Sequence, residues 1–419
     1  MPGNQYQMKP NRVIIAVEGG GQTGGAERVA FDSVKILSDA GIPVVILSSA
    51  SEIDATFMDL PGVEGVALDL NTNVDRYFAG GKKGMVLNLL EDSAMRKQFA
   101  KILPALDSPH TILHAHGFHN YFTQALFRVA NGLQMKTILT CHDYGLSCPN
   151  SMQFDYEKSS ICLLDPLSRE CRQAKCMGEP GHRVKTLRFG RSWASEKLFR
   201  APQHLDLALC VSDFQRSVLE RHFGNQVRLK TLCSPVYPAS ADQQTPSQAS
   251  DFLWIGRMTA EKDAVTPAKI CREEGFQLTI VGDGPQLDEV RAVNPDATYL
   301  GWISPSEVRS AQCRSRALIL SSKCYETASL VVLECLAAGI PCIVPSISAA
   351  TSWVEDNVNG LIYDIDHPDS MKDALSRMQD DDFVARLGKS AYDRYWQAPF
   401  TAERHRDELL QHYSEVLSR

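Results

Sequence analysis

Apolar runs of strand length alternate with amphipathic helical patterns along most of this chain, and no other feature restricts its fold as strongly. The run VIIAV at 13–17 precedes a glycine-rich turn and a helical pattern, and a second apolar run, VVIL, occupies 44–47. This order is a β-α-β unit with parallel strands. Similar runs recur at 111–114, 136–140 and 205–211. We therefore expect the first part of the chain to form an open, doubly wound parallel sheet.

A second alternating set begins after residue 250, where the runs FLWIG, QLTIVG, TYLGW, ALILSS and PCIVPS are separated by helix candidates. The segment 235–250 is rich in Pro, Ser, Ala and Gln without an apolar period, as in a linker. The expected domains are 1–235, with an insertion at about 148–200, and 251–395. Residues 396–419 carry an amphipathic helical pattern. Two doubly wound domains facing a cleft would favour a nucleotide-type ligand.

The composition excludes several classes of protein. A chain of 419 residues is long enough for two or three domains, and 44% hydrophobic residues exclude a mainly disordered chain. Lys plus Arg number 43 against 50 acidic residues, so the net charge of −7 speaks against a nucleic-acid binder. Twelve scattered cysteines fit a reducing compartment, and no run of eighteen apolar residues occurs. We expect a cytoplasmic protein.

Glycines cluster directly after the first apolar run, at 19–21 and at 24–25. Such a loop lets backbone amides approach an anion at the start of the following helix. The spacing does not match the G-x-G-x-x-G dinucleotide pattern, and no acidic residue ends the next strand to hold a ribose. A flexible turn is the alternative interpretation.

Histidines gather at the ends of two predicted strands of the first domain. His114, His116 and His119 follow one strand, and His142 with Asp143 follows another. Site residues concentrate at such strand ends. We favour His142, because the adjacent Asp143 could tune its protonation. A structural role is the alternative for any single histidine.

Two cations and two carboxylates mark the second domain. Arg257 and Lys262 follow an apolar run and precede a helical pattern, where they can bracket a diphosphate. Glu326 stands eight positions before Glu334, little more than two helical turns, so both carboxylates can face one cleft. Such a pair can bind sugar and ribose hydroxyls. A capping glutamate plus a solvated one is the alternative, although Glu334 lies among apolar residues.

Taken together, these motifs resemble the retaining glycosyltransferases of family four over nearly the whole chain. The resemblance rests on the GGAER loop, His142, the Arg257 and Lys262 pair, the IVGDGP segment and the E-x7-E block ending in ECLAAGIPCIV, which is the most specific motif. It implies the α/β GT-B fold, in which two Rossmann-like domains face a cleft. The second domain would hold the nucleotide sugar and the first the acceptor. The last helix, 396–419, would cross back to the first domain.

The resemblance also implies roles for the matched residues. Arg257 and Lys262 would hold the diphosphate, Glu334 the ribose and Glu326 the donor sugar. Four further positions would contact the donor: Gly25, Gly284, Ser329 and Leu330. His142 would line the reaction centre, with two neighbours on the acceptor side: His116 and Asp143. Such enzymes require no metal or other cofactor, because the cationic pair and a helix dipole offset the diphosphate charge.

Two positions depart from the family pattern. The family usually has glycine after the Glu-Lys pair, where this chain has Asp263. The family also has Phe-Gly after the first glutamate, where this chain has Ala328 and Ser329. The amide and hydroxyl of Ser329 could still bind a phosphate.

The insertion suggests two further sites. Four of its cysteines could form a zinc site, although their spacing lacks paired C-x2-C motifs, and free thiols are the alternative: Cys148, Cys162, Cys171 and Cys176. The start of the insertion resembles a subset of the family with cysteines in the acceptor-side loop. The segment 181–200 holds six Arg or Lys residues with Trp193 and Phe199, which suits an anionic membrane surface or a pyrophosphate-lipid acceptor. A solvated helix face is the alternative.

The sequence therefore predicts a retaining, metal-independent hexosyltransferase. It would move a sugar from a UDP- or GDP-sugar to a hydroxyl of a glycan or polyprenyl-diphosphate-linked acceptor, in cell-surface polysaccharide synthesis. The enzyme would be cytoplasmic and could bind peripherally to the inner face of the membrane. The alternatives are a nucleotide-sugar epimerase on the same fold and a non-catalytic nucleotide-sugar sensor.

Overall fold

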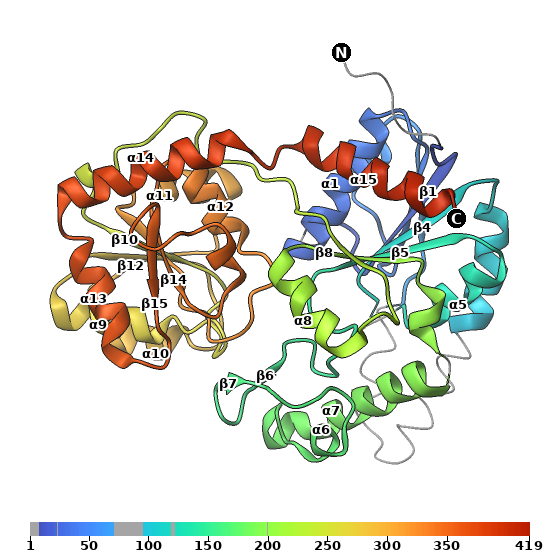
Figure 1. Ribbon diagram of the computed structural model, residues 1–419, viewed down its shortest axis with the longest axis horizontal. Coiled ribbons are helices and arrows are strands. Elements are labelled where there is room, and N and C mark those ends of the chain that lie inside the picture. The colour runs from blue at the N-terminus through green and yellow to red at the C-terminus, as the bar shows by residue number, and fades with distance from the viewer. Residues whose placement is uncertain (1–7, 23, 71–94, 119–121, 199) are drawn as a thin grey trace. The chain divides into compact units, whose positions relative to one another are not determined.

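The computed structural model describes residues 8–22, 24–70, 95–118, 122–198 and 200–419. Contacts divide the chain into two units, each built on its own sheet (Figure 1). The first unit takes its described residues from 1–152, 163–235 and 402–419, and the second from 153–162 and 236–401. The predicted α/β class with two parallel-sheet, Rossmann-like units is confirmed.

The first unit contains a seven-stranded parallel sheet in the order β3-β2-β1-β4-β5-β8-β9. Its strands are β1 (Arg12–Val17), β2 (Val44–Ser48), β3 (Val63–Ala67), β4 (Thr111–His116), β5 (Lys136–Cys141), β8 (Leu207–Cys210) and β9 (Leu229–Thr231). The central strands are buried almost without interruption. Their sequences are continuous apolar runs because helices cover both faces of a parallel sheet.

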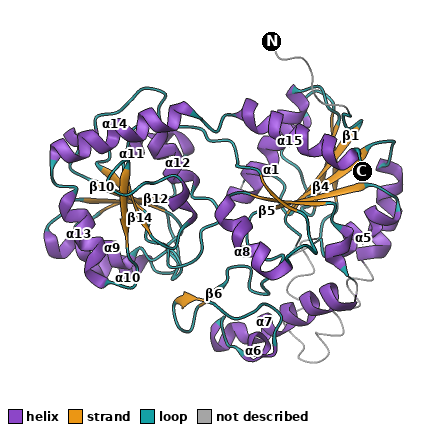
Figure 2. Ribbon diagram, in the orientation of Figure 1, coloured by secondary structure: helices purple, strands orange, loops and turns teal. Residues whose placement is uncertain are grey.

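Helices pack against this sheet from several parts of the chain (Figure 2). They are α1 (Gly25–Asp39), α2 (Ala55–Met58), α5 (Ala125–Gly132), α8 (Asp213–Phe223) and α15 (Ala402–Leu417). The last helix contributes Leu409, Leu410, Tyr413 and Val416 to the same core as α1 and the sheet. The end of the chain is thus a buried part of the first unit.

The segment 148–204 carries small elements, and the insertion expected at about 148–200 contains all of them but the last. They are β6 (Phe154–Asp155), β7 (Ser160–Ile161), α6 (Arg169–Gln173), α7 (Gly178–Trp193), the π-helix η2 (Ala194–Leu198) and the 3-10 helix η3 (Ala201–His204). The antiparallel β6-β7 hairpin groups with the second unit, and the helices group with the first. The side chain of Lys185 is buried and bonds three carbonyls at the end of α6, which fixes α6 against α7.

The second unit contains a six-stranded parallel sheet in the order β12-β11-β10-β13-β14-β15. Its strands are β10 (Phe252–Ile255), β11 (Leu278–Val281), β12 (Thr298–Gly301), β13 (Ala317–Ile319), β14 (Cys342–Pro345) and β15 (Gly360–Tyr363). The helices are α9 (Val265–Glu274), α10 (Leu287–Val293), α11 (Pro305–Cys313), α12 (Leu330–Ala337), α13 (Pro368–Arg377) and α14 (Asp381–Gln397), with the 3-10 turns η4 (Pro246–Gln248) and η5 (Ala349–Ser352). One apolar core joins the sheet to α9, α10 and α13, and another joins it to α11, α12 and α14.

The segment with linker composition lies along the second unit. The Gln244 amide donates to the carbonyl of Ala338, and the Tyr392 hydroxyl donates to the carbonyl of Ala241. A Cβ added to Gly388 of α14 would lie 2.9 Å from Pro246. The polar, proline-rich composition therefore belongs to a segment that packs on α12 and α14.

Candidate functional site

The first unit has a pocket at the carboxyl ends of β4 and β5. Its volume is about 120 Å³, and it is open to solvent. We call it the histidine pocket, and its lining residues come from β1, α1, β4, β5 and their loops: Glu18, Ala26, Glu27, His116, Gly117, Phe118, Leu139, Thr140, Cys141, His142, Asp143 and Leu146. The pocket thus contains three of the residues that the sequence analysis selected.

The histidines of this pocket contact one another. His116 Nδ1 lies 3.0 Å from His142 Nε2, and their rings stack. Behind them, His114 bonds the hydroxyls of Tyr413 and Thr140 through its two nitrogens, at 2.8 and 2.7 Å. Burial lowers the pKa of His142 to about 4. His142 is therefore neutral at physiological pH.

Burial is the cause of the low pKa of His142, and the tuning of its protonation by Asp143 stays a prediction. The Asp143 carboxylate accepts a hydrogen bond from the Gly145 amide at 2.7 Å. Burial raises the pKa of Asp143 to about 6, and the charge of Glu18 acts in the same direction. The pocket therefore combines a neutral histidine with a carboxyl group that titrates near neutrality.

Glu18 and Glu27 line the histidine pocket and were missed in the sequence analysis. Glu18 directly follows β1, so the strand-end rule that selected the histidines applies to it equally. Glu27 lies in the first turn of α1, and a Cβ on Gly24 would meet its carboxylate at 2.7 Å. The predicted Gly25 begins α1 and is exposed, with open space where a Cβ would stand.

In the second unit, Lys262 and Glu326 form an ion pair with 2.6 Å between Nζ and Oε1. Ser322 donates a further hydrogen bond to Glu326 Oε1. Burial alone would raise the pKa of Glu326, but Lys262 and Ser322 hold it below the usual value. The same carboxylate keeps the pKa of Lys262 high despite burial. The structure thus brings two predicted donor residues into direct contact.

Asp263, which stands at the family's glycine position, has a left-handed backbone with φ of +51°. Asparagine and aspartate enter this region more readily than other non-glycine residues. Its carboxylate accepts a hydrogen bond from the Thr266 hydroxyl at 2.6 Å and pairs with Lys323 Nζ at 2.8 Å. The loop therefore keeps a glycine-like backbone, with side-chain bonds compensating the cost of the conformation.

The exposed Arg257 lies in the loop after β10, and this loop packs tightly on the IVGDGP segment. Met258 N donates to the carbonyl of Asp283 at 2.9 Å. A Cβ on Gly282, whose φ is +126°, would lie 1.9 Å from the carbonyl oxygen of Gly256. Gly284 approaches Met258 in the same way. Both glycines are thus required for the two loops to meet.

Tyr156 of the β6-β7 hairpin was also missed. The hairpin groups with the second unit, and the charges of Arg257 and Lys262 act on the Tyr156 phenol. Burial and the neighbouring Glu261 raise its pKa to about 12. No strand-end or glycine pattern marks this position, so nothing in the sequence pointed to it.

Helix α12 begins after Ser329 and carries Glu334 on its second turn. The Ser329 hydroxyl oxygen is buried, and no described residue bonds it. Glu334 is buried, and Gln312 Nε2 donates to its Oε2 at 3.3 Å. The Leu330 amide donates to the Ala328 carbonyl at 3.0 Å, whereas the Ser329 amide stands at the helix N-terminus, which favours an anion.

The four cysteines of the predicted zinc site do not form a cluster. Among the described residues, no group of three or more His, Cys, Asp or Glu side chains is placed to hold a metal ion. The Cys148 thiol donates to Asn150 Oδ1 at 3.0 Å, and Asn150 Nδ2 donates to Cys176 Sγ at 3.4 Å. Cys162 groups with the second unit and Cys171 with the first. The Asn150 side chain therefore bridges Cys148 and Cys176.

The basic segment forms α7 and η2. Its Lys185 side chain is buried and donates hydrogen bonds to carbonyl groups at the end of α6, so it is not available to an anionic surface. Trp193 and Leu198 are exposed at 42% and 59%, and Phe199 lies outside the described residues. Across the part of the chain that the structure describes, no helix has the length and apolar character needed to cross a membrane.

Two family models match the chain. One, described as Glycosyltransferase Family 4, matches residues 23–236, and the other, Glycosyl transferases group 1, matches residues 249–381. A sucrose-phosphate synthase structure from Thermosynechococcus elongatus aligns with a TM-score of 0.66 at 15% identity, over 97% of this chain and 99% of that one. At this identity the structural likeness concerns the fold alone.

Curated relatives match parts of the chain. A GDP-mannose-dependent alpha-mannosyltransferase of Corynebacterium glutamicum is 28% identical over 179 residues, which are 41% of this chain and 42% of the relative. A GDP-mannose-dependent alpha-(1-6)-phosphatidylinositol monomannoside mannosyltransferase of Mycobacterium tuberculosis is 29% identical over 274 residues, covering 56% of this chain and 68% of the relative. The match to the first relative thus spans less than half of its length.

Proposed function

Because the chain belongs to Glycosyltransferase Family 4 and has the GT-B fold, we propose that it transfers a sugar from a nucleoside diphosphate sugar to a hydroxyl group. The acceptor is a glycan or lipid-linked glycan of cell-surface polysaccharide synthesis. GDP-mannose is the first donor to test, since the names of several relatives specify it. The observation that carries the proposal is the Lys262–Glu326 ion pair in the loops that follow the central strands β10 and β13.

The second unit supplies groups suited to each part of the donor. Lys262 and the exposed Arg257 offset the diphosphate charge, together with the amides that begin α12. Glu326 accepts hydroxyls of the sugar, and Glu334 accepts those of the ribose. These positive groups balance the charge of the leaving diphosphate, so the proposed reaction uses no metal ion.

The reaction that we propose retains the anomeric configuration. The bond between the anomeric carbon and the β-phosphate oxygen breaks, and the acceptor oxygen forms its bond on the same face of the sugar. The acceptor proton passes to the leaving phosphate. His142, neutral at physiological pH, donates or accepts a hydrogen bond at the reaction centre and does not serve as the acid.

Donor binding tests the proposal directly. We expect calorimetric titration to show binding of GDP or UDP, and GDP-mannose to release GDP faster when a suitable acceptor is present. Arg257→Ala should weaken binding of the diphosphate, whereas Lys269→Ala should leave it unchanged, because Lys269 is an exposed residue of α9 paired with Glu273. A parental affinity in the Arg257 variant would contradict the phosphate role.

The ribose role of Glu334 has its own test. Glu334→Gln should lose affinity for GDP while the affinity for the 2′-deoxy nucleotide changes little, because a carboxylate accepts hydroxyl hydrogen bonds more strongly than an amide. If the parent protein binds ribose and deoxyribose nucleotides equally, Glu334 does not bind the ribose.

A further inference from the structure

The wall of the histidine pocket includes a hydroxyl group to which the proposed reaction assigns no role. Thr140 of β5 lines the pocket, and its Oγ1 lies 2.7 Å from His114 Nε2. On the other side of the ring, His114 Nδ1 lies 2.8 Å from the phenol oxygen of Tyr413 in α15. All three residues are at most 3% exposed. Two buried hydrogen bonds therefore connect the last helix of the chain to the pocket.

The direction of these two hydrogen bonds follows from the protonation of His114. Burial lowers the pKa of His114 to about 3, so the neutral ring has one N–H donor and one acceptor nitrogen. One of the two hydroxyls must therefore donate to the ring, while the other accepts from it. A phenol is a stronger acid than an aliphatic alcohol, so Tyr413 is the favoured donor, to Nδ1. His114 then carries its hydrogen on Nε2 and donates it to Thr140.

This arrangement leaves the hydrogen of the Thr140 hydroxyl to be donated elsewhere. Within the described part of the chain, His114 is the only side chain that bonds Thr140 Oγ1. A hydroxyl that accepts one hydrogen bond still has its own hydrogen to donate. A buried donor without an acceptor is unfavourable. A ligand that brings an acceptor oxygen to this wall of the pocket therefore gains a hydrogen bond.

The carboxyl groups of the pocket restrict the ligand further. Glu18, Glu27 and Asp143 also line it, and an ionised carboxylate only accepts hydrogen bonds. A ligand group that accepts from Thr140 and also donates to a carboxylate is a hydroxyl. A sugar, which carries several hydroxyls, can satisfy both sides of the pocket at once.

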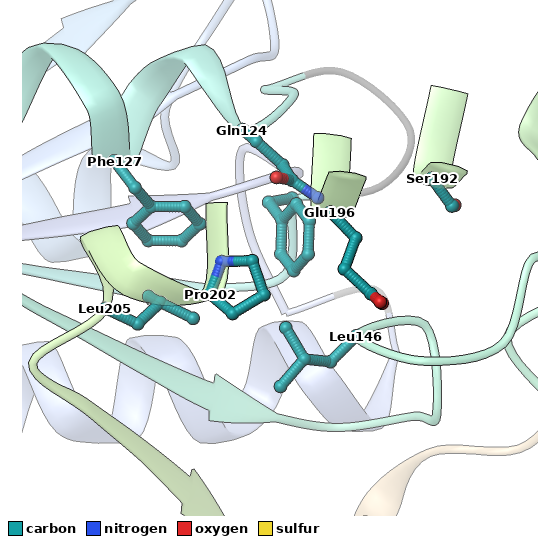
Figure 3. A pocket seen from close by; sticks show the side chains of 8 residues that line it. Gln124, Phe127, Leu146, Ser192, Glu196, Pro202 and Leu205 are labelled. Atoms are coloured by element: carbon teal, nitrogen blue, oxygen red, sulfur yellow. The ribbon is translucent and has the colours of Figure 1, made fainter. Parts of the chain in front are cut away.

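The pocket offers no apolar extension for a different kind of ligand. Leu146 lines both the histidine pocket and a neighbouring cavity (Figure 3). That cavity has a volume of about 10 Å³, which is room for about one water molecule. The histidine pocket itself has about 120 Å³ and is open to solvent. A ligand that enters it therefore meets the polar wall.

We propose that Thr140 donates a hydrogen bond to a hydroxyl oxygen of the acceptor sugar, and that Tyr413, acting through His114, is the positioning residue that keeps the Thr140 hydrogen available to this ligand. The inference rests on the proposed function, because it names a residue that holds the acceptor for that transfer. It also gives α15 a role beyond packing, since a helix from the end of the chain prepares the acceptor side of the site.

The tautomer of His114 tests the positioning step without any ligand. At pH 7.5 we expect nitrogen NMR of the histidine-labelled protein to show His114 protonated at Nε2 and unprotonated at Nδ1, with its signals assigned through their loss in His114→Gln. Tyr413→Phe should remove this single tautomer. The matched control is Tyr363→Phe, at a buried tyrosine of the second unit that donates to the Leu320 carbonyl, and it should leave the spectrum unchanged. A parent protein with the hydrogen on Nδ1 would overturn the inference, because Thr140 would then donate to His114.

Binding of methyl glycosides tests the ligand step without requiring turnover. The probes are methyl mannoside, glucoside and galactoside, compared by ligand-observed NMR. We expect Thr140→Val to weaken binding of the tightest probe by about fivefold or more, Thr140→Ser to restore most of it, and Tyr413→Phe to weaken it as well. One monodeoxy form of that probe, which lacks the contacted oxygen, should bind the parent and Thr140→Val equally. Thr137→Val, the same change at a buried threonine of β5 that bonds the His204 carbonyl, should keep the parental affinity.

Three binding results would overturn the inference. The first is that no glycoside binds, which would show that the pocket does not hold a sugar. The second is a parental affinity in Thr140→Val. The third is an equal loss for the probe and for every monodeoxy form, which would mean that Thr140 supports the fold alone. GDP titration on the same preparations separates these failures from that of the proposed function, because only absence of nucleotide binding rejects the proposed donor site.

Discussion

Lys262 and Glu326 each neutralise the charge of the other in a largely buried ion pair. Their side chains are 30% and 12% exposed, so removing one partner leaves a largely buried charge on the other. We predict that Lys262→Met weakens GDP binding at least tenfold, about 1.4 kcal/mol. It should also lower the free energy of unfolding by about 1–3 kcal/mol. Calorimetry and urea denaturation measure the two effects separately.

The double variant Lys262→Met with Glu326→Gln provides the control. Without the buried charge, we expect stability to recover while nucleotide affinity stays low, because the ammonium that would contact phosphate is still missing. A double variant that regains affinity would show that Lys262 serves the fold alone.

We expect a substitution of His142 to change turnover, whereas substitutions of the donor residues should change nucleotide affinity. We predict that His142→Ala lowers turnover by about 10²-fold or more while GDP affinity changes little, since only interactions gained in the transition state raise the chemical rate. Because its pKa is about 4, His142 should contribute no inflection to the pH-rate profile between pH 6 and 8. Steady-state kinetics across this range, with donor and acceptor varied separately, test both statements. Near-parental turnover in the variant would assign His142 a structural role.

Asp143 should make stability depend on pH. Its pKa is raised by burial to about 6 from an ordinary value near 3.8, so between these pH values the folded protein binds more protons than the unfolded chain. Stability is therefore lost as pH rises through 6. We predict that Asp143→Asn, which keeps an acceptor for the Gly145 amide, is more stable than the parent by about 1–3 kcal/mol at pH 7.5. Urea denaturation should show this difference disappear near pH 4, and a constant difference would contradict the assignment.

Loop geometry before α9 depends on one residue, Asp263. We predict that Asp263→Ala destabilises the protein more than Asp263→Gly does, by about 1 kcal/mol. Both variants lose the bonds to Thr266 and Lys323, but only alanine retains the cost of a left-handed backbone. Thermal unfolding of the two variants side by side provides the comparison. The reverse order would show that the left-handed backbone at position 263 does not cost stability.

The chain returns to the first unit through α15, so we expect this helix to contribute to the free energy of unfolding of that unit. Leu409 of this helix is fully buried in the core of the first unit. Leu409→Ala should lower the free energy of unfolding of that unit by about 2–5 kcal/mol. Hydrogen exchange should accelerate in β1 and β4 and remain unchanged in β10 and β14. Val332→Ala, buried in the second unit, should give the opposite pattern. Equal acceleration in both sheets would show that the chain unfolds as one unit.

Sequence alone was sufficient for the two parallel sheets, because buried strands and amphipathic helices differ in their periodicity. It was also sufficient for the strand-end residues of the site, since parallel strands end at a common edge. His116, His142 and Lys262 could be selected in this way, and Glu18 follows from the same rule. Glu326 was selected instead by its spacing from Glu334.

Only the tertiary structure decided which of these side chains meet. The bond between His116 and His142, the ion pair of Lys262 with Glu326, and the backbone of Asp263 depend on contacts between segments that no local pattern relates. The same holds for the two hydrogen bonds of His114, whose partners come from β5 and from the distant α15. Periodicity reports which face of an element is buried, whereas the partners of a polar group are set by packing between elements.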